Sequence, residues 1–140
     1  MARRVILLVD DTNFAEITKT FWLMGEGFAD EVVVARDGAE AIDYLFRPGR
    51  GAPEMPCVVF LDLNMPRLGG FGVLEKMRKE EGTRFVPVVI LTSSDHPHDV
   101  LRAYESGTSS YGDKLHDGAP WHEVVRYWAE VNLTPYLLVR

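Results

Sequence analysis

Three acidic residues follow apolar runs in positions where they could do chemistry together. Asp10 and Asp11 come directly after Val5–Val9, and Asp62 ends the apolar run in VVFLD. Burying like charges close together costs free energy unless a positive group lies beside them. Clustered carboxylates are ligands for Mg²⁺, and a carboxylate can also attack phosphorus to form an aspartyl phosphate. These residue types therefore predict a divalent-metal site that carries out phosphoryl chemistry.

The elements that must position these acids alternate along the chain. Short apolar or β-branched runs predict strands at 5–9, 31–35, 57–61, 86–91 and 109–113. Apolar residues spaced three or four positions apart predict helices at 14–24, 39–46, 70–81, 96–106 and 120–131, and Asp37 is the expected N-cap of the second. Three of the strand runs are continuously apolar, which is typical of parallel strands buried on both faces. The sequence thus predicts an α/β fold: a doubly wound, five-stranded parallel sheet with helices on both faces.

In such a sheet, ligands bind at the carboxyl ends of the strands. The predicted strands end at Asp10-Asp11, Asp62, Thr92 and Lys114. Taken singly, these residues have ordinary roles as helix caps or solvated side chains. Together they form one site, in which Thr92 would hydrogen-bond a phosphoryl oxygen and Lys114 would hold another as a point charge.

Composition limits the kinds of partner. The 140 residues carry a net charge of −6, and the basic residues are scattered, which argues against a nucleic-acid or membrane-surface binder. The first apolar run is too short for a signal-peptide core or a spanning helix. Cys57 is the sole cysteine, so no disulfide can form within the chain and a cytoplasmic location is expected. Its side chain is predicted to be small and buried. We expect one domain over residues 1–140, with 130–140 as a C-terminal tail.

The motifs LLVDDTN, VVFLDLNMPRLGG, VPVVILTSS and SYGDK, in this order, resemble the receiver domain of two-component response regulators. The resemblance covers essentially the whole chain and implies the flavodoxin-like strand order 2-1-3-4-5. It implies that Asp62 accepts a phosphoryl group from a histidine kinase. It also implies that Mg²⁺ (or Mn²⁺) is held by Asp11, Asp62 and the backbone carbonyl of Asn64, with Asp10 acting mainly through water.

The same resemblance implies a switch pair, Thr92 and Tyr111, in which the ring moves inward behind the hydroxyl; the open alternative for Tyr111 is an aromatic side chain that only packs on an edge strand. One position departs from the family pattern, because Lys114 is followed by Leu115 and not by the usual proline. A cis bond before a residue other than proline costs about 3–4 kcal/mol, so we expect a trans bond here, although a strained cis bond stays open.

The expected protein is a signalling domain and not an enzyme, since it would catalyse only its own phosphorylation and dephosphorylation. VVARDGAEAIDYLF, EGTRFVPVVILTSSD and the apolar tail resemble small regulators that serve phytochrome-type kinases, so a bacteriophytochrome is the expected partner. Output would be by protein binding to an unknown target. A homodimer is expected through the predicted helix at 96–106, the strand at 109–113, the helix at 120–131 and the tail at 130–140; the open alternative is a tail folded back on its own domain.

Rival functions fit the residues less well. A phosphatase of the aspartyl-phosphate kind needs an acid two residues after its nucleophile, where this chain has Asn64. A flavodoxin-like cofactor carrier needs a phosphate loop where DDTNF supplies acids. His96 and His98, at the start of a predicted helix, are expected to face solvent and not to bind a metal. The alternative that stays open is a degenerate receiver, a binding module that is no longer phosphorylated, and Leu115 is its only support.

Overall fold

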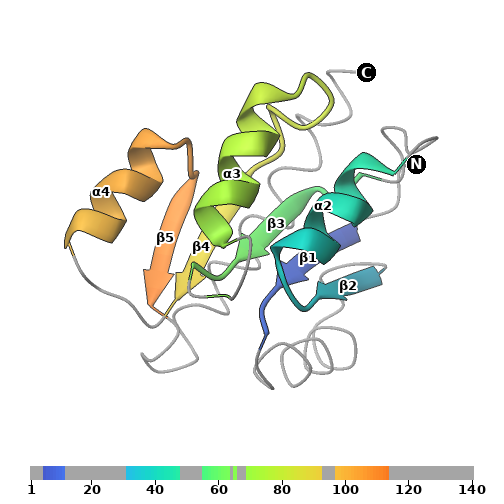
Figure 1. Ribbon diagram of the computed structural model, residues 1–140, viewed down its shortest axis with the longest axis horizontal. Helices are drawn as coiled ribbons and strands as arrows, with labels where there is room; N and C mark the ends of the chain where they lie inside the picture. The colour runs from blue at the N-terminus through green and yellow to red at the C-terminus, as the bar shows by residue number, and fades with distance from the viewer. Residues whose placement is uncertain are drawn as a thin grey trace.

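A five-stranded parallel sheet forms the centre of the protein (Figure 1). In the computed structural model, residues 5–11, 31–47, 55–63, 65, 69–92 and 97–113 are described, with backbone alone at 91, 92, 97 and 110–113. The strands are β1 (Val5–Val9), β2 (Glu31–Ala35), β3 (Val58–Leu61), β4 (Val88–Thr92) and β5 (Ser110–Asp113). They are arranged in the order β2-β1-β3-β4-β5, and every neighbouring pair is parallel. The predicted strand order is confirmed.

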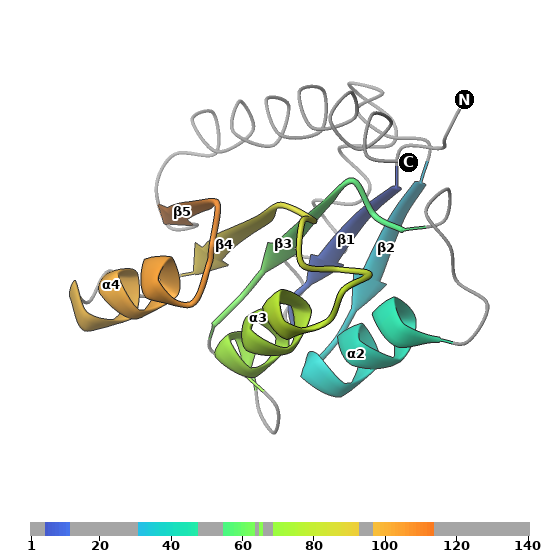
Figure 2. The ribbon, with the colours of Figure 1, turned by 90° about the horizontal axis from the view of Figure 1, so that it is seen from above.

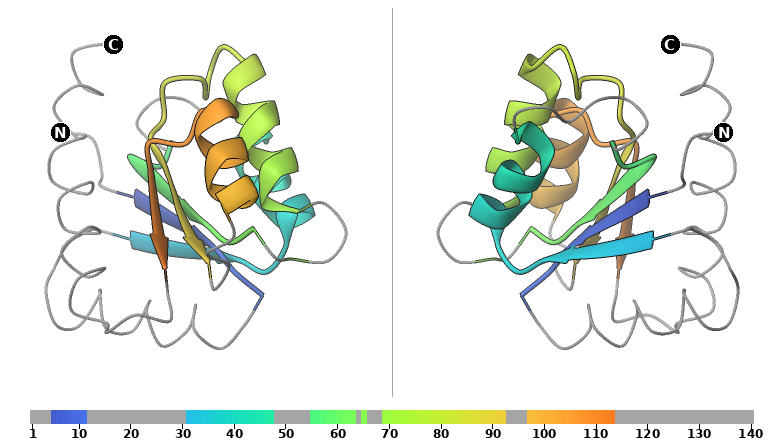
Figure 3. Two further views of the ribbon diagram at one scale, coloured as in Figure 1. Left: turned by 90° about the vertical axis from the view of Figure 1, so that its left-hand side faces the viewer. Right: turned by 90° about the vertical axis from the view of Figure 1, so that its right-hand side faces the viewer.

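Three helices cover one face of this sheet: α2 (Gly38–Phe46), α3 (Gly70–Lys79) and α4 (Pro97–Glu105). Figure 2 shows all three on the same side, and both views of Figure 3 agree. The helices predicted at 14–24 and 120–131 lie outside the described residues. No helix within the described ranges is long and apolar enough to cross a membrane.

The central strands are buried on both faces, as their unbroken apolar runs predict. Every residue of β1 and of β3 is buried. Residues from both strands join α2 and α3 side chains such as Leu45, Leu74 and Met77 in one hydrophobic core. Because both faces are covered, the polar chemistry of the sheet is confined to its ends.

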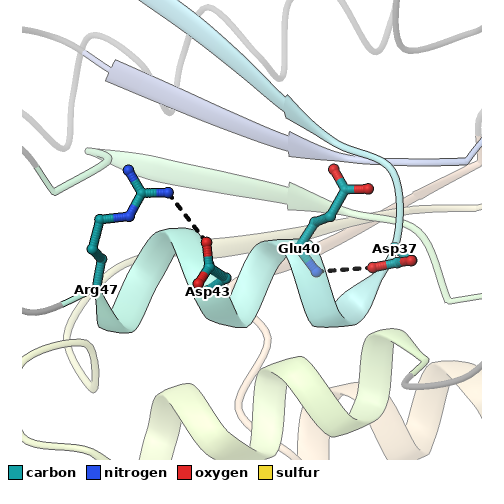
Figure 4. A network of polar contacts seen from close by, with 4 residues as sticks. All are labelled: Asp37, Glu40, Asp43 and Arg47. Atoms are coloured by element: carbon teal, nitrogen blue, oxygen red, sulfur yellow. Dashed lines mark hydrogen bonds and ion pairs between the residues drawn. The ribbon is translucent and has the colours of Figure 1, made fainter.

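Helix α2 begins where the sequence predicts a cap. The Asp37 side chain accepts a hydrogen bond from the Glu40 amide at 2.8 Å, and Asp43 pairs with Arg47 at the other end of the helix (Figure 4). The Asp37 bond satisfies one of the amides that a helix start leaves without an internal partner.

Two boundaries differ from the sequence prediction by two residues. Helix α3 ends at Lys79 and not at Glu81. Beyond its end, the buried Thr83 hydroxyl donates to the Met77 carbonyl in the last turn of the helix at 2.8 Å. Strand β4 begins at Val88 and not at Val86, because Pro87 has no amide hydrogen for the ladder. The end of α3 and the start of β4 both depend on hydrogen-bonding groups, which the spacing of apolar residues does not reveal.

Helix α4 ends in a turn that is tied to α3. Gly107 has a φ of 101°, and its amide and that of Thr108 donate to the carbonyls of Tyr104 and Ala103, the pattern of a Schellman motif. The Arg78 guanidinium of α3 donates to the Gly107 carbonyl at 2.9 Å and also to those of Val86 and Arg84. Burial lowers the pKa of Arg78, and these carbonyls compensate the desolvated charge.

Candidate metal centre

The strand ladder places Asp10 and Asp62 side by side. Val9 pairs with Leu61 in the register of β1 and β3, so the two acids leave adjacent strands at the same level. The Asp62 amide continues the ladder by donating to the Val9 carbonyl at 2.9 Å, and the Asp10 amide donates to the Ala35 carbonyl at 3.0 Å. Because their backbones are held by sheet hydrogen bonds, both acids have fixed starting points at the carboxyl edge.

The carboxylates of Asp10, Asp11 and Asp62 form one cluster. One oxygen from each lies within 4.8 Å of the others. Asp10 and Asp62 are 1% and 4% exposed, while Asp11 is exposed. Two of the three carboxylates are therefore buried and the third faces solvent, so an ion can reach the cluster from the side of Asp11.

The charges in this cluster repel one another. Two unit charges 4.8 Å apart interact by on the order of 3 kcal/mol at an effective dielectric constant of about 20. A divalent cation among the oxygens converts this repulsion into attraction. Carboxylate oxygens are the ligands that Mg²⁺ and similar hard cations take, so the residues present fit such an ion.

The start of α3 packs directly on the backbone of Asp62. A Cβ added to Gly70 would lie 2.3 Å from the Asp62 carbonyl oxygen and 3.0 Å from the Leu63 Cα. Only a residue without a side chain allows α3 to begin this close to the acid. From the sequence, Gly70 is predicted only to begin a helix. The Gly69-Gly70 pair, which ends the motif after Asp62, is the feature that could have indicated this close approach.

The other predicted site residues are placed in part. Thr92 is the last residue of β4 and pairs with Asp113, the residue before Lys114, so the carboxyl ends of β4 and β5 meet. The side chains of Thr92 and Tyr111 lie outside the described residues, as do Asn64, Lys114 and the bond from Lys114 to residue 115.

Two further side-chain predictions concern Cys57 and the histidines. Cys57 is buried, as predicted. His98 is exposed near the start of α4, as predicted, and His96 lies outside the described residues. Neither Cys57 nor His98 belongs to the carboxylate cluster.

The family model described as the response regulator receiver domain matches residues 6–125 of this chain. A probable methanogenesis regulatory protein, FilR2 of Methanothrix harundinacea, is 34% identical over 94% of this chain and 87% of its own length. Response regulator Rcp1 of Synechocystis is 29% identical over 94% of this chain and 93% of its own length.

Solved structures agree with these sequence relatives. The Mn²⁺-bound form of Rcp1 superimposes with a TM-score of 0.76 at 29% identity, over 91% of this chain and 95% of that one. A phosphorylated cyanobacterial phytochrome response regulator, RcpA, gives 0.78 at 26% identity, over 93% and 96%. The bacteriophytochrome response regulator AtBRR gives 0.68 at 37% identity, over 88% and 90%.

Proposed function

The chain belongs to the response regulator receiver domains of two-component systems, and we propose that Asp62 is the residue at which it is phosphorylated. Receivers accept their phosphoryl group from histidine kinases. The observation that carries the assignment to Asp62 is its place in the cluster with Asp10 and Asp11, at the carboxyl end of the central strand β3.

The transfer is a displacement at phosphorus. An oxygen of the Asp62 carboxylate attacks the phosphorus and forms an O–P bond, while the P–N bond to the kinase histidine breaks and its electrons return to the imidazole. The backbone of Asp62, held by the β1 ladder and by contact with Gly70, keeps the attacking oxygen at the edge of the sheet. Positioning of this kind accounts for much of the catalysis of phosphoryl transfer.

We propose that the resident metal is Mg²⁺ (or Mn²⁺), held by Asp10, Asp11, Asp62 and the backbone carbonyl of Asn64. When bound, the ion neutralises charge on the phosphoryl oxygens. The three clustered carboxylates support this ligand set, and Mn²⁺ is the ion in the Rcp1 structure.

The remaining roles follow the family pattern. Lys114 binds a phosphoryl oxygen, Thr92 turns its hydroxyl toward the new group, and Tyr111 follows Thr92 inward. The meeting of the ends of β4 and β5 supports this grouping. The domain thus acts as a signalling protein that catalyses only its own phosphorylation and dephosphorylation.

The test of the function is intact mass after incubation with acetyl phosphate and Mg²⁺. We expect an adduct of about 80 Da that disappears in Asp62→Asn and in EDTA. Asp43→Asn is a matched control, because Asp43 is an exposed acid on α2 outside the cluster. A folded wild-type protein that binds Mg²⁺ and takes no adduct would instead favour the phosphorylation-independent binding module.

We propose a bacteriophytochrome histidine kinase as the partner, in a cytoplasmic location. AtBRR and a second solved structure, RtBRR, are described as bacteriophytochrome response regulators and are 37% and 35% identical to this chain, which supports this pairing. Phosphotransfer from a purified bacteriophytochrome to Asp62 is the test, with a kinase of another sensory class as the control. Equal transfer rates from both kinases would contradict the pairing.

We also propose that residues 1–140 form a single receiver domain whose output is protein binding, without nucleic acid or membrane. A homodimer would use α4, β5, the predicted helix at 120–131 and the tail at 130–140. Leu101 and Tyr104, exposed on α4, support an apolar contact there. Sedimentation of the full chain beside a chain ending at residue 129 tests the dimer, and a monomeric full chain at micromolar concentration would refute it.

A further inference from the structure

Helix α4 is weakly anchored to the rest of the protein. Among residues 98–105, Ala103 alone is buried, while Leu101 and Tyr104 are 60% and 51% exposed. By contrast, α3 buries Val73, Leu74 and Met77 along its inner face. Since buried apolar area supplies most of the packing free energy, α4 needs other contacts to hold its position.

The carboxyl end of α4 has such a contact. The Schellman turn at Gly107 is bound by the Arg78 guanidinium at 2.9 Å, and a Cβ at Gly107 would lie 2.9 Å from the Arg78 side chain. This end of the helix is therefore fixed to α3 and to the entry into β5.

The last turn of α4 is joined to the first turn of α3 by a single described cation–π contact. The guanidinium of Arg102 lies 4.0 Å from the centroid of the Phe71 ring. Phe71 is in the first turn of α3 and packs against the hydrophobic core, while Arg102 is exposed. Because Arg102 is exposed, its guanidinium can leave the ring for water without passing through the core.

Phe71 also lies next to the residue that touches the phosphorylation site. Its neighbour Gly70 packs so closely on the Asp62 carbonyl that the first turn of α3 cannot shift toward residue 62 without moving its backbone. A phosphoryl group adds about −1.5 to −2 of charge beside the positive amino end of α3. We expect the added charge to shift the first turn of α3, and the Phe71 ring with it.

We propose that the Phe71–Arg102 contact is a latch that couples the phosphorylation state of Asp62 to the position of α4. The latch rests on the proposed function and acts through α3, separately from Thr92 and Tyr111. Because Gly107 is held by Arg78, a change at Arg102 rotates α4 about its carboxyl end and re-presents Leu101 and Tyr104 to a partner. Arg102 is thus a positioning residue for the output face.

Amide hydrogen exchange over residues 97–105 tests the latch, measured with and without phosphorylation by acetyl phosphate and Mg²⁺. The test variant is Arg102→Met, which keeps an apolar stem and removes the charge. Arg84→Met is the matched control, since the Arg84 guanidinium lies 4.8 Å from the Phe85 ring in the turn after α3, and Arg78 binds only the backbone carbonyl of Arg84. Arg102→Lys, which keeps the charge, should restore part of the coupling.

We expect α4 in unphosphorylated Arg102→Met to exchange about two- to five-fold faster than in the wild type, the effect of losing an exposed cation–π contact. We also expect the phosphorylation-dependent change in exchange over 97–105 to shrink by a similar factor, with Arg84→Met unchanged in both measurements. Because coupling is reciprocal, the affinity for beryllofluoride, a phosphoryl analogue, should shift by the same factor.

An identical phosphorylation-dependent change in wild type and Arg102→Met overturns the latch. Equal effects of Arg102→Met and Arg84→Met overturn it as well. A wild-type protein that takes no phosphoryl group overturns the proposed function; the latch is then judged by exchange of the unphosphorylated proteins, where equal rates in wild type and Arg102→Met refute it.

Discussion

At the scale of single residues, burial and charge oppose each other in the carboxylate cluster. Asp10 and Asp62 are almost fully buried, yet their oxygens lie within 4.8 Å of each other and of an oxygen of Asp11. Folding without a cation therefore costs electrostatic free energy, which a bound cation offsets. Binding and stability are linked at this site, and substitutions there change both.

Asp11→Asn should separate the two effects. The side chain is exposed, so the substitution loses little packing and removes one of three like charges. We expect the thermal midpoint in EDTA to stay the same or rise, and the affinity for Mg²⁺ to fall by about tenfold or more, because ligand charge sets affinity. Titration calorimetry and thermal unfolding measure the two quantities. Unchanged Mg²⁺ affinity would contradict the ligand role of Asp11.

Gly70→Ala should destabilise the fold and slow phosphorylation. Alanine is the better helix former, so any loss of stability reflects the alanine Cβ, which would lie 2.3 Å from the Asp62 carbonyl oxygen. Overpacking of this kind costs about 1–3 kcal/mol. Gly82→Ala is the matched control, since its Cβ would meet nothing within 4 Å. Chemical denaturation and the rate of acetyl phosphate labelling are the measurements, and equal effects of both variants would refute the close contact.

At the scale of elements, short polar contacts hold segments whose apolar pattern is weak. Strand β5 has the weakest apolar pattern of the five strands. It is joined to β4 at its start by the Thr108 hydroxyl, which donates to the Val88 carbonyl at 2.9 Å, and by the Ser109 amide, which donates to the same carbonyl at 2.7 Å. These bonds set the register that brings Thr92 opposite Asp113.

The cap of α2 gives a test at this scale. Asp37→Ala removes the acceptor of the 2.8 Å bond from the Glu40 amide and should lower the free energy of unfolding by about 1 kcal/mol. Asp37→Asn keeps an acceptor oxygen and should lose much less. Urea denaturation of the three proteins measures the difference. If Asp37→Ala and Asp37→Asn are equally stable, the side chain does not cap the helix.

At the scale of the whole molecule, the metal site is coupled to global unfolding through the central strands. Cys57, the sole cysteine, lies buried directly before β3, and β3 ends at Asp62. A thiol reagent reaches Cys57 when these strands come apart. A cation that binds only the folded protein lowers the unfolded population.

We therefore expect Mg²⁺ to slow labelling of Cys57. At a free concentration about ten times the dissociation constant, the labelling rate should fall about tenfold, provided that refolding outpaces labelling. Monovalent salt at matched ionic strength is the control. Labelling that does not respond to Mg²⁺ in the wild type, or responds equally in Asp11→Asn, would contradict the coupling between this site and unfolding.

Local sequence patterns are enough to predict the strands, the order of the acids along the chain and the cap at Asp37. These features depend on local patterns: continuous apolar runs mark doubly buried strands, and an aspartate before a helix satisfies its first amides. Because parallel strands bring their carboxyl ends to one edge, the pattern also predicted that Asp10, Asp11 and Asp62 would meet, and they do.

The contacts between atoms of different elements cannot be predicted from these local patterns, because they depend on the folded arrangement. The approach of Gly70 to the Asp62 carbonyl, the bond from Arg78 to Gly107 and the contact of Arg102 with Phe71 each join segments whose separation depends on how the helices pack on the sheet. Glycine and arginine have no fixed meaning in a hydrophobic pattern. Their roles here come from close packing, which is a property of the folded domain as a whole.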